Sequence, residues 1–319
     1  MIIANPIYDP IFKLLMENKR IATFFIETLI GEKIETIAMM PHEYVYEKQA
    51  KIDKLKEEQK LEVVEEQVFK ILRYDFVATI RNANGEHKKI IIEIQKTSKP
   101  TDLMRFRSYL GKQYQTQDVI EVATGNVEEA LPIISIYLLG FTVSKTKSPA
   151  IKVNRTYIDL IEQKEIKEKS TFIEALTHDG FFVQIPHIAG KPRTALEKLL
   201  SIFEQTNFID QQETTKKYQY SDKTIEELEE MLNLLEYAAA DPQTKREMEE
   251  AWWAEQDEKE YERVRQELIQ KNQELTKKDQ ELTKQSQELT KKDQELTKQS
   301  QEIEELHRQI KELQTGKKP

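Results

Sequence analysis

Hydrophobic and polar residues follow two different patterns along the chain. Over roughly the first 205 residues, short apolar runs of strand length alternate with amphipathic stretches of helical period. From residue 263 onward, one large apolar residue recurs every seven positions among charged and polar residues. The first pattern predicts a mixed α/β domain, and the second predicts a long helix.

The first predicted elements are two amphipathic helices near the N-terminus. Asp9 followed by Pro10 is the pattern of a helix N-cap with proline at the first helical position. Apolar residues then recur at helical spacing up to Gly31, and glycine is a typical helix terminator. Residues 49–68 are highly charged, which predicts a further helix, and this segment resembles an insertion into the domain.

A β-hairpin is the most informative prediction in the first half of the chain. Asn84-Gly85 is a strong turn signal between the apolar runs LRYDFVATI and KIIIEIQKT. A helix rich in arginine and tyrosine is predicted over 103–117, and the apolar run 133–141 is typical of a buried central strand. Two strands, a helix and a third strand, with helices outside, predict an α/β core.

The C-terminal repeat predicts a coiled-coil helix with an incomplete seam. Its apolar residues lie seven apart: Leu268, Leu275, Leu282, Leu289, Leu296, Ile303 and Ile310. A coiled coil needs apolar residues at both the a and d positions. The complementary position is polar in either frame: Asn272, Asp279 and Ser286 in one, Lys271, Lys278 and Gln285 in the other. Only Leu306 and Leu313 add a second stripe. We therefore expect a long solvated helix that either forms a weak homo-oligomer or serves as a spacer.

Charge is distributed unequally between the two parts of the chain. Residues 1–200 carry 29 Lys and Arg against 28 Asp and Glu, whereas residues 201–319 carry 19 against 29. The net charge of −9 therefore belongs to the C-terminal part, and it does not exclude a nucleic-acid partner for the N-terminal part. We predict an α/β domain over 1–210, a helical extension over 218–262 and a heptad-repeat coiled coil over 263–313.

Composition excludes several classes of protein. The glycines are too far apart for a Rossmann or P-loop nucleotide site. The absence of cysteine excludes disulfides, zinc-thiolate sites and thiol nucleophiles, and it fits a reducing cytoplasm. The longest apolar stretch, Leu131 to Val143, is shorter than the ~20 residues of a membrane helix, and no signal peptide is visible. We expect a soluble, cytoplasmic protein with no membrane partner.

Carboxylates on the predicted hairpin form the candidate site. Alternation along a strand places Glu93 and Gln95 on one face, and Asp75 on the partner strand lies among apolar residues. If the register brings Asp75 near Glu93, the two like charges need a cation between them. Hard oxygen ligands suit Mg²⁺ or Mn²⁺, which can activate water and stabilise phosphoryl transfer. The structural alternative is that these carboxylates pair on an exposed face with nearby cations: Arg73, Arg81 or Lys88.

These residues and the motifs around them resemble a nuclease family. Asp75, the NANG turn and the IEIQ segment at 92–95 resemble the D…E-x-K/Q core of the PD-(D/E)XK nuclease superfamily. The opening NPIYDPIFKLLM resembles the D-x-x-F-K start of its recombination-promoting nuclease/putative transposase group. Arg107-Ser108-Tyr109 followed by Tyr114 resembles the R-x-Y helix of that group, and LPIISI resembles its next strand. The resemblance covers roughly residues 5–250 and leaves out the repeat.

The resemblance implies a fold, an activity and a set of site residues. It implies a restriction-endonuclease-like core, which is a mixed central sheet flanked by helices, and a mobile-element or recombination-promoting endonuclease that cleaves DNA phosphodiesters. Asp75 and Glu93 would hold Mg²⁺ or Mn²⁺, and Asp9 would be the acidic residue of the first helix. Gln95 would stand where a catalytic lysine is usual, although a neutral amide can only hydrogen-bond. Lys13, on the same helix face as Asp9, is the candidate to supply the missing charge.

Basic residues on the helix after the hairpin are candidates for contacts with DNA. Arg105, Arg107 and Lys112 could meet phosphates, where basic side chains contribute non-specific affinity. A solvated helix face with Tyr109 in the core is the alternative. Two other functions also stay open. One is a DNA-binding protein of the same fold with weakened catalysis, marked by Gln95, and the other is an interaction scaffold in which the coiled coil is the working part.

Overall fold

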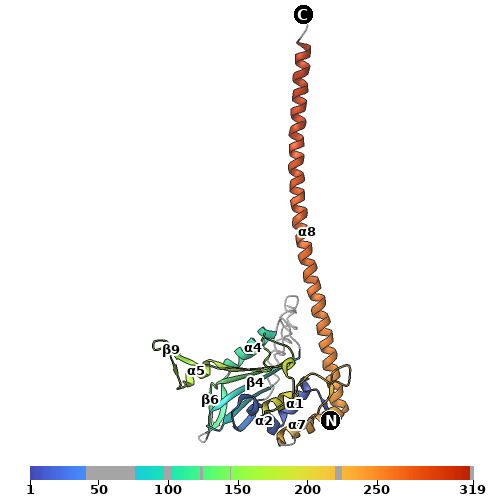
Figure 1. Cartoon of the computed structure of the whole chain (residues 1–319). Coiled ribbons are helices and arrows are strands. Elements are labelled where there is room, and N and C mark those ends of the chain that lie inside the picture. Colours follow the sequence, from blue (N-terminus) through green and yellow to red (C-terminus); the bar gives the residue numbers. More distant parts are fainter. Residues whose placement is uncertain (41–75, 97–101, 123–124, 144, 220–224, 317–319) are drawn as a thin grey trace, which may run out of the picture. The chain divides into compact units, whose positions relative to one another are not determined.

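The computed structural model consists of two units, Met1–Trp252 and Trp253–Pro319, which we call the N-terminal and C-terminal units. Figure 1 shows the chain. The residues that the structure describes are 1–40, 76–96, 102–122, 125–143, 145–219 and 225–316. The charged helix predicted over 49–68 and the candidate residue Asp75 lie outside the described residues.

A mixed six-stranded sheet lies at the centre of the N-terminal unit (Figure 1). Its strands, in spatial order, are β2 (Ile34–Met39), β3 (Phe76–Asn82), β4 (His87–Gln95), β7 (Ile133–Leu139), β11 (His178–Gln184) and β8 (Ala150–Val153). The neighbours β2, β3 and β4 are antiparallel, β4, β7 and β11 are parallel, and β8 is antiparallel to β11. This arrangement confirms the predicted α/β class, and β7 is the predicted central strand, buried at every residue.

Two helices near the N-terminus confirm the amphipathic pair expected there. They are α1 (Asp9–Glu17) and α2 (Lys19–Ile30), and α2 ends at Gly31, whose φ of 74° is left-handed. The predicted N-cap role of Asp9 is wrong, because Tyr8 precedes the helix and no side chain caps it. Asp9 is the first helical residue, and its carboxylate instead forms an ion pair with Lys13.

One face of the sheet packs against a large apolar core that α1, α2 and α7 cover (Figure 1). Ile90, Ile92 and Ile94 of β4 point into this core, as alternation along a strand requires. Helix α6 (Ala195–Ser201) contributes Leu199 and Leu200. Helix α7 (Glu226–Ala240) contributes five buried residues: Leu228, Met231, Leu232, Leu235 and Ala238. Helix α7 lies within the helical extension that the sequence predicts over 218–262, and its apolar face is buried in the same core as the first helices.

The opposite face of the sheet carries α4 (Asp102–Tyr114), which connects the parallel strands β4 and β7. Tyr109 of α4 packs with Ile91 and Ile133 in a second, smaller apolar cluster. Because parallel neighbours need a crossover connection, α4 is placed directly over the strands that it joins. The alternate residues of β4 therefore face two different environments.

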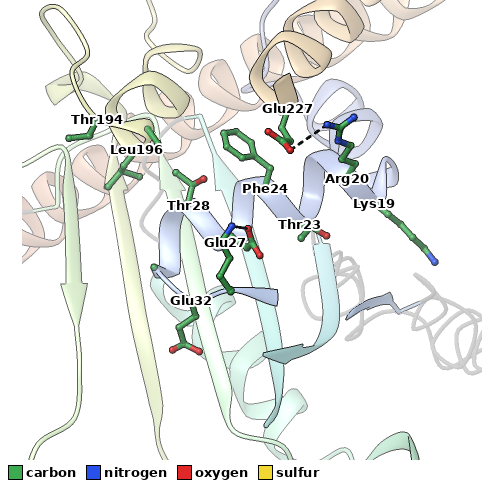
Figure 2. A pocket seen from close by; sticks show the side chains of 13 residues that line it. Lys19, Arg20, Thr23, Phe24, Glu27, Thr28, Glu32, Thr194, Leu196 and Glu227 are labelled. Atoms are coloured by element: carbon green, nitrogen blue, oxygen red, sulfur yellow. Dashed lines mark hydrogen bonds and ion pairs between the residues drawn. The ribbon is translucent and has the colours of Figure 1, made fainter. Parts of the chain in front are cut away.

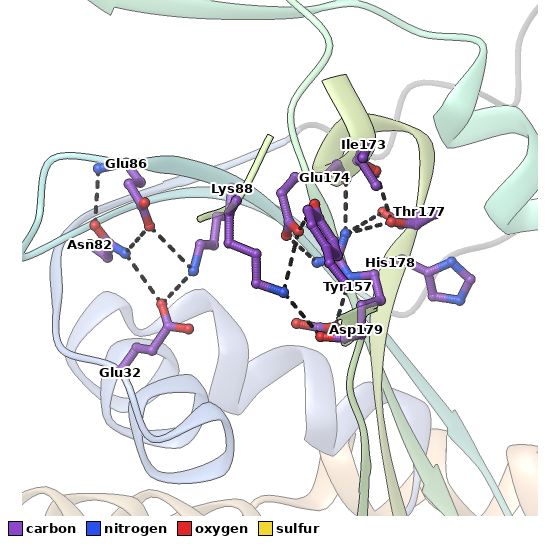
Figure 3. A network of polar contacts seen from close by, with 12 residues as sticks. Glu32, Asn82, Glu86, Lys88, Tyr157, Ile173, Glu174, Thr177, His178 and Asp179 are labelled. Atoms are coloured by element: carbon purple, nitrogen blue, oxygen red, sulfur yellow. Dashed lines mark hydrogen bonds and ion pairs between the residues drawn. The ribbon is translucent and has the colours of Figure 1, made fainter. Parts of the chain in front are cut away.

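The predicted hairpin is confirmed and joins β3 to β4. Gly85 in its turn has a φ of 83°, the left-handed conformation that glycine adopts without strain. Asn82 donates a hydrogen bond to Glu86 at 2.9 Å, and Lys88 forms an ion pair with Glu32 at 2.6 Å (Figure 3). The first contact lies within the hairpin turn, and the second connects the hairpin to Glu32, which follows α2.

Several short elements surround the central sheet. They comprise three two-stranded ladders, one short helix and one 3-10 turn: β1 (Ile2–Ala4) with β12 (Thr215–Lys217), β5 (Asp118–Val122) with β6 (Gly125–Glu129), β9 (Tyr157–Asp159) with β10 (Lys164–Ile166), α5 (Thr171–Leu176) and η3 (Ile185–His187). Arg155 connects α5 to β11 because its guanidinium pairs with Glu174 at 2.7 Å and with Asp179 at 2.9 Å. Figure 3 shows Glu174 and Asp179 in this network.

Lys216 of β12 is a buried cation. Its side chain is 2% exposed, and its Nζ donates to the carbonyl oxygens of Ile202 and Glu204 just after α6. Burial lowers the pKa of Lys216 to about 7, although the charge of Glu204 acts in the opposite direction. The unfolded chain, with a lysine pKa of about 10.4, therefore binds more protons than the folded chain between these two values.

We expect the free energy of unfolding to rise with pH between about 7 and 10 because of Lys216. Relative to Lys216→Met, the wild-type chain should gain on the order of 2 kcal/mol between about pH 7 and pH 9. Urea unfolding at several pH values measures this difference, with Lys217→Met, which removes an exposed lysine, as the control. Parallel pH profiles for wild type and Lys216→Met would contradict the assignment.

The C-terminal unit is helical. Helix α8 (Pro242–Thr315) begins in the N-terminal unit and continues through the described part of the C-terminal unit. Its heptad residues are more than half exposed, from 51% at Ile310 to 62% at Leu289. Within the described part of the chain, no helix is both long and apolar enough to cross a membrane.

Candidate functional site

The C-terminal end of β4 supplies the candidate site. Glu93 and Gln95 lie on the face of the sheet that α4 covers, whereas Ile92 and Ile94 point into the large core. Both polar side chains are buried: Glu93 is 2% exposed and Gln95 is 8% exposed. Their neighbours on β7 are Tyr137 and Leu139. A carboxylate and an amide are therefore held together inside the domain, where electrostatic interactions are stronger than in water.

Arg105 of α4 contacts the same site. Its Nη2 donates a hydrogen bond to Oε1 of Gln95, and its guanidinium lies 5.9 Å from the ring centroid of Tyr109. The sequence predicted Arg105 as a phosphate contact on the helix surface, but the side chain is half-buried and directed at Gln95. The structure thus brings a guanidinium group next to Gln95.

Aromatic side chains form an apolar wall beside Glu93. Tyr137 of β7 stacks on Phe182 of β11 with ring centroids 5.0 Å apart, and Phe106 of α4 lies 5.2 Å from Tyr137. Burial raises the pKa of Tyr137, and the nearby Glu93 carboxylate acts in the same direction. Attraction between a carboxylate and a cation is stronger beside such apolar groups than in water.

The predicted partner carboxylate, Asp75, directly precedes the first residue of β3 in the sequence. Asp75 lies outside the described residues, which resume at Phe76. Phe76 pairs across the hairpin with Ile92, the residue before Glu93. The described pairing of β3 with β4 therefore ends at Phe76 and Ile92. In the sequence, Asp75 and Glu93 are the next residues in the direction away from the hairpin turn.

The alternative in which Glu93 pairs with a nearby cation on an exposed face is wrong for Arg81 and Lys88, the two of these cations that the structure describes. Arg81 lies 3.7 Å from Glu35, and Lys88 pairs with Glu32 at 2.6 Å. Glu93 is also buried, so it does not lie on the exposed face that this alternative requires. Arg73, the third cation considered, lies outside the described residues.

Asp9 and Lys13 form their own ion pair on α1. Lys13 Nζ lies 2.6 Å from Asp9 Oδ2, which confirms that they share a helix face. The buried side chains of α1 belong to the large core, on the face of the sheet opposite to α4. Lys96 is also directed to that side, with its Nζ 2.9 Å from Tyr8 Oη and 3.3 Å from Glu213 Oε2. The structure brings Arg105 to Gln95, whereas Lys13 is paired with Asp9.

The remaining residues of α4 divide between core and surface. Tyr109 is 4% exposed and packs in the smaller cluster, as the solvated-face alternative predicted. Arg107 is exposed, and Lys112 is half-buried. Tyr114 is hydrogen-bonded to His178 at 2.9 Å between its hydroxyl and Nδ1. Arg107 is thus the exposed member of the three predicted DNA contacts.

The donor chemistry at β4 is compatible with a hard divalent cation. Mg²⁺ in proteins uses one or two carboxylates and takes its other ligands from water and substrate phosphate. Glu93 supplies one such carboxylate, and Asp75 is the sequence candidate for the second. Among the described residues, no group of three or more His, Cys, Asp and Glu side chains is close enough to hold a metal. A magnesium site of the two-carboxylate kind does not require such a group.

A groove in the N-terminal unit lies away from this site. It has a volume of about 850 Å³ and is lined by residues of α2, α6 and α7, among them Phe24, Thr28 and Leu196 (Figure 2). Arg20 in this groove pairs with Glu226 at 2.8 Å, and Lys33 pairs with Glu27 at 2.9 Å. Its charges are neutralised by their neighbours, and its size alone is a weaker functional signal than the buried polar residues of β4.

Comparison with known proteins identifies no relative of this chain. No protein-family model, no curated protein and no solved structure matches it.

Proposed function

We propose that this protein is a metal-dependent DNA endonuclease with a restriction-endonuclease-like core, similar to the PD-(D/E)XK enzymes of the recombination-promoting nuclease/putative transposase group. The observation that carries the proposal is the pair Glu93 and Gln95, both buried at the end of a central strand and accompanied by the Arg105 guanidinium. A polar group is costly to bury, and such groups cluster at functional sites.

The arrangement of the sheet supports the same proposal. Helices cover both faces of a mixed sheet, and the E-x-Q strand β4 is central, with antiparallel β3 on one side and parallel β7 on the other. The crossover through α4 carries the arginine- and tyrosine-rich motif to the face on which Glu93 lies. The E-x-Q strand and the R-x-Y helix, which are adjacent motifs in the sequence, thus meet on one side of the sheet, whereas α1, which carries the first motif, packs on the other side.

Glu93 and Asp75 are the residues that we propose to hold Mg²⁺ or Mn²⁺. Asp75 is included on its position in the sequence, directly before Phe76, whose partner Ile92 directly precedes Glu93. When bound, a divalent ion would lower the pKa of a water molecule and neutralise charge on the scissile phosphate. The buried, apolar surroundings of Glu93 would strengthen its attraction for the ion.

Gln95 and Arg105 would each supply one function of a catalytic lysine: Gln95 a hydrogen-bond donor and Arg105 a positive charge. Arg105 donates to the amide oxygen of Gln95, which orients the amide group and leaves its NH₂ as a donor toward water or phosphate. The guanidinium supplies the positive charge, but it is a hydrogen-bond donor with no acceptor atom. Neither side chain can therefore accept a proton from the attacking water, and we expect a slower enzyme than one with lysine at position 95.

Exposed basic residues next to the site would contact the DNA backbone. Arg107 lies two residues after Arg105 on α4 and is exposed to solvent. Arginine and lysine neutralise phosphates without reading sequence, so binding through this helix would be non-specific and would weaken with added salt.

Cleavage of supercoiled plasmid by the purified chain tests this function. We expect nicking with Mg²⁺ or Mn²⁺ and none with EDTA, and a higher rate in Gln95→Lys if the lysine restores a proton acceptor. Absence of cleavage in every metal, with DNA binding retained, would instead favour the DNA-binding protein with weakened catalysis. Absence of both cleavage and binding would leave the interaction scaffold as the remaining function.

A further inference from the structure

The end of α8 carries a complete apolar seam that the preceding repeats lack. Ile303, Leu306 and Ile310 are spaced by three and four residues, so they lie on one face of the helix. All three are exposed, at 53%, 56% and 51%. Each heptad that begins with a leucine from Leu268 to Leu296 offers that leucine alone, with a polar residue at the second position. An exposed seam of this spacing is typical of one side of a coiled coil.

We infer that α8 pairs with α8 of a second copy of this chain in a parallel two-stranded coiled coil that the last two heptads hold together. The terminal residues choose the frame, because β-branched Ile303 and Ile310 at a with Leu306 at d is the combination that favours two strands. Leu313 continues the d positions in the sequence. In this frame the repeated leucines from Leu268 to Leu296 also occupy a.

The distribution of apolar residues favours the parallel orientation. In a parallel pair each a residue faces its own counterpart, so the two terminal seams meet and every repeated leucine meets a leucine. In an antiparallel pair that overlaps over residues 268–313, a positions face d positions, so Ile303 and Ile310 would face Lys278 and Lys271, and most of the repeated leucines would also face polar residues. Only Leu306 and Leu313 would face leucines. An antiparallel overlap of the termini alone would leave the leucines from Leu275 to Leu296 exposed. The parallel pair therefore buries the most apolar surface.

Charges in the repeats partly compensate each other in the parallel frame. Lys278 at d lies beside Asp279 at e of the second copy, and the same combination recurs fourteen residues later. Glu274 at g, however, faces the same Asp279 of the second copy, and like charges there are unfavourable. The repeats thus allow pairing in this register but add little to its strength, which makes the terminal heptads decisive.

The mass of the full-length chain in solution tests where the seam lies. By sedimentation equilibrium we expect wild type to have twice the chain mass of 37.6 kDa. Leu306→Asp should give a monomer, because it buries a charge at d, whereas Gln301→Asp adds the same charge at the outward f position and should leave the dimer unchanged. A monomeric wild type up to 0.2 mM, or a dimer that survives Leu306→Asp, would overturn the proposal. Circular dichroism verifies that each variant keeps its helix.

A single introduced thiol tests the orientation. The chain has no cysteine, so Gln299→Cys creates one reactive position at d. In the parallel pair the two thiols face each other, and mild oxidation should crosslink most of the chain into disulfide dimers. In an antiparallel pair they would lie about 25 Å or more apart, whether the helices overlap over all of α8, over the repeats or at their termini alone, from a helical rise of ~1.5 Å per residue. Dimers without crosslinking would overturn the parallel orientation. The readout is independent of nuclease activity, so the proposed function and the proposed pairing can fail separately.

Discussion

Glu93→Gln should lower the rate of metal-dependent plasmid cleavage by a factor of about 10² to 10³. The change removes the negative charge of the proposed metal ligand but keeps the shape of the buried side chain, which is 2% exposed. A catalytic metal contributes several kcal/mol of transition-state stabilisation, and each 1.4 kcal/mol corresponds to about a tenfold change in rate. The measurement is the initial rate of nicking at saturating Mg²⁺ and again at saturating Mn²⁺.

The control for Glu93→Gln is a carboxylate of the same sheet with no role in the site. Glu35 of β2 has a side chain that is 47% exposed and lies 3.7 Å from Arg81. Glu35→Gln should therefore cleave like wild type. If Glu93→Gln also kept the wild-type rate while it remained folded, Glu93 would be a structural residue and the proposed metal site would be wrong.

Lys89→Met should destabilise the folded chain by about 3–5 kcal/mol. Lys89 on β4 and Asp118 on β5 are 1% and 2% exposed, and their Nζ and Oδ1 atoms lie 2.7 Å apart. Lys89 Nζ and Asp118 Oδ1 form an ion pair, but their geometry is not that of a hydrogen bond. Lys89 Nζ donates a hydrogen bond to Thr116 Oγ1 at 3.2 Å. Removal of the lysine leaves a buried carboxylate without its cation, which is far more costly than loss of the attraction itself. Urea unfolding followed by circular dichroism measures the effect.

The double variant Lys89→Met with Asp118→Leu separates the two contributions. Because it removes both charges, it should recover most of the stability that Lys89→Met loses. Lys88→Met removes the neighbouring lysine, whose ion pair with Glu32 is less buried, and should cost much less. A loss below about 1 kcal/mol for Lys89→Met would mean that water reaches the pair, and that this part of the sheet is more open than the structure describes.

Local sequence patterns determined the elements whose formation depends on neighbouring residues. The turn at Gly85, the end of α2 at Gly31 and the strand β7 all follow from short-range rules of backbone conformation and apolar spacing. The assignment of Glu93 and Gln95 to one face of β4 also needed only the two-residue period of a strand. The position of the Asp9 helix start was missed by one residue, which is the usual uncertainty of helix ends.

Contacts between distant segments could be decided only by the tertiary structure. The sequence contains no signal that Arg105 turns inward to Gln95 and not outward to solvent, because helical periodicity alone does not say which neighbour a long side chain reaches. The pairing of Lys89 with Asp118 joins residues 29 positions apart, and the burial of α7 joins the two ends of the N-terminal unit. The sequence by itself thus determined which strand carries the candidate carboxylate. Packing decided which cation accompanies it, because that choice depends on how the helices lie across the sheet.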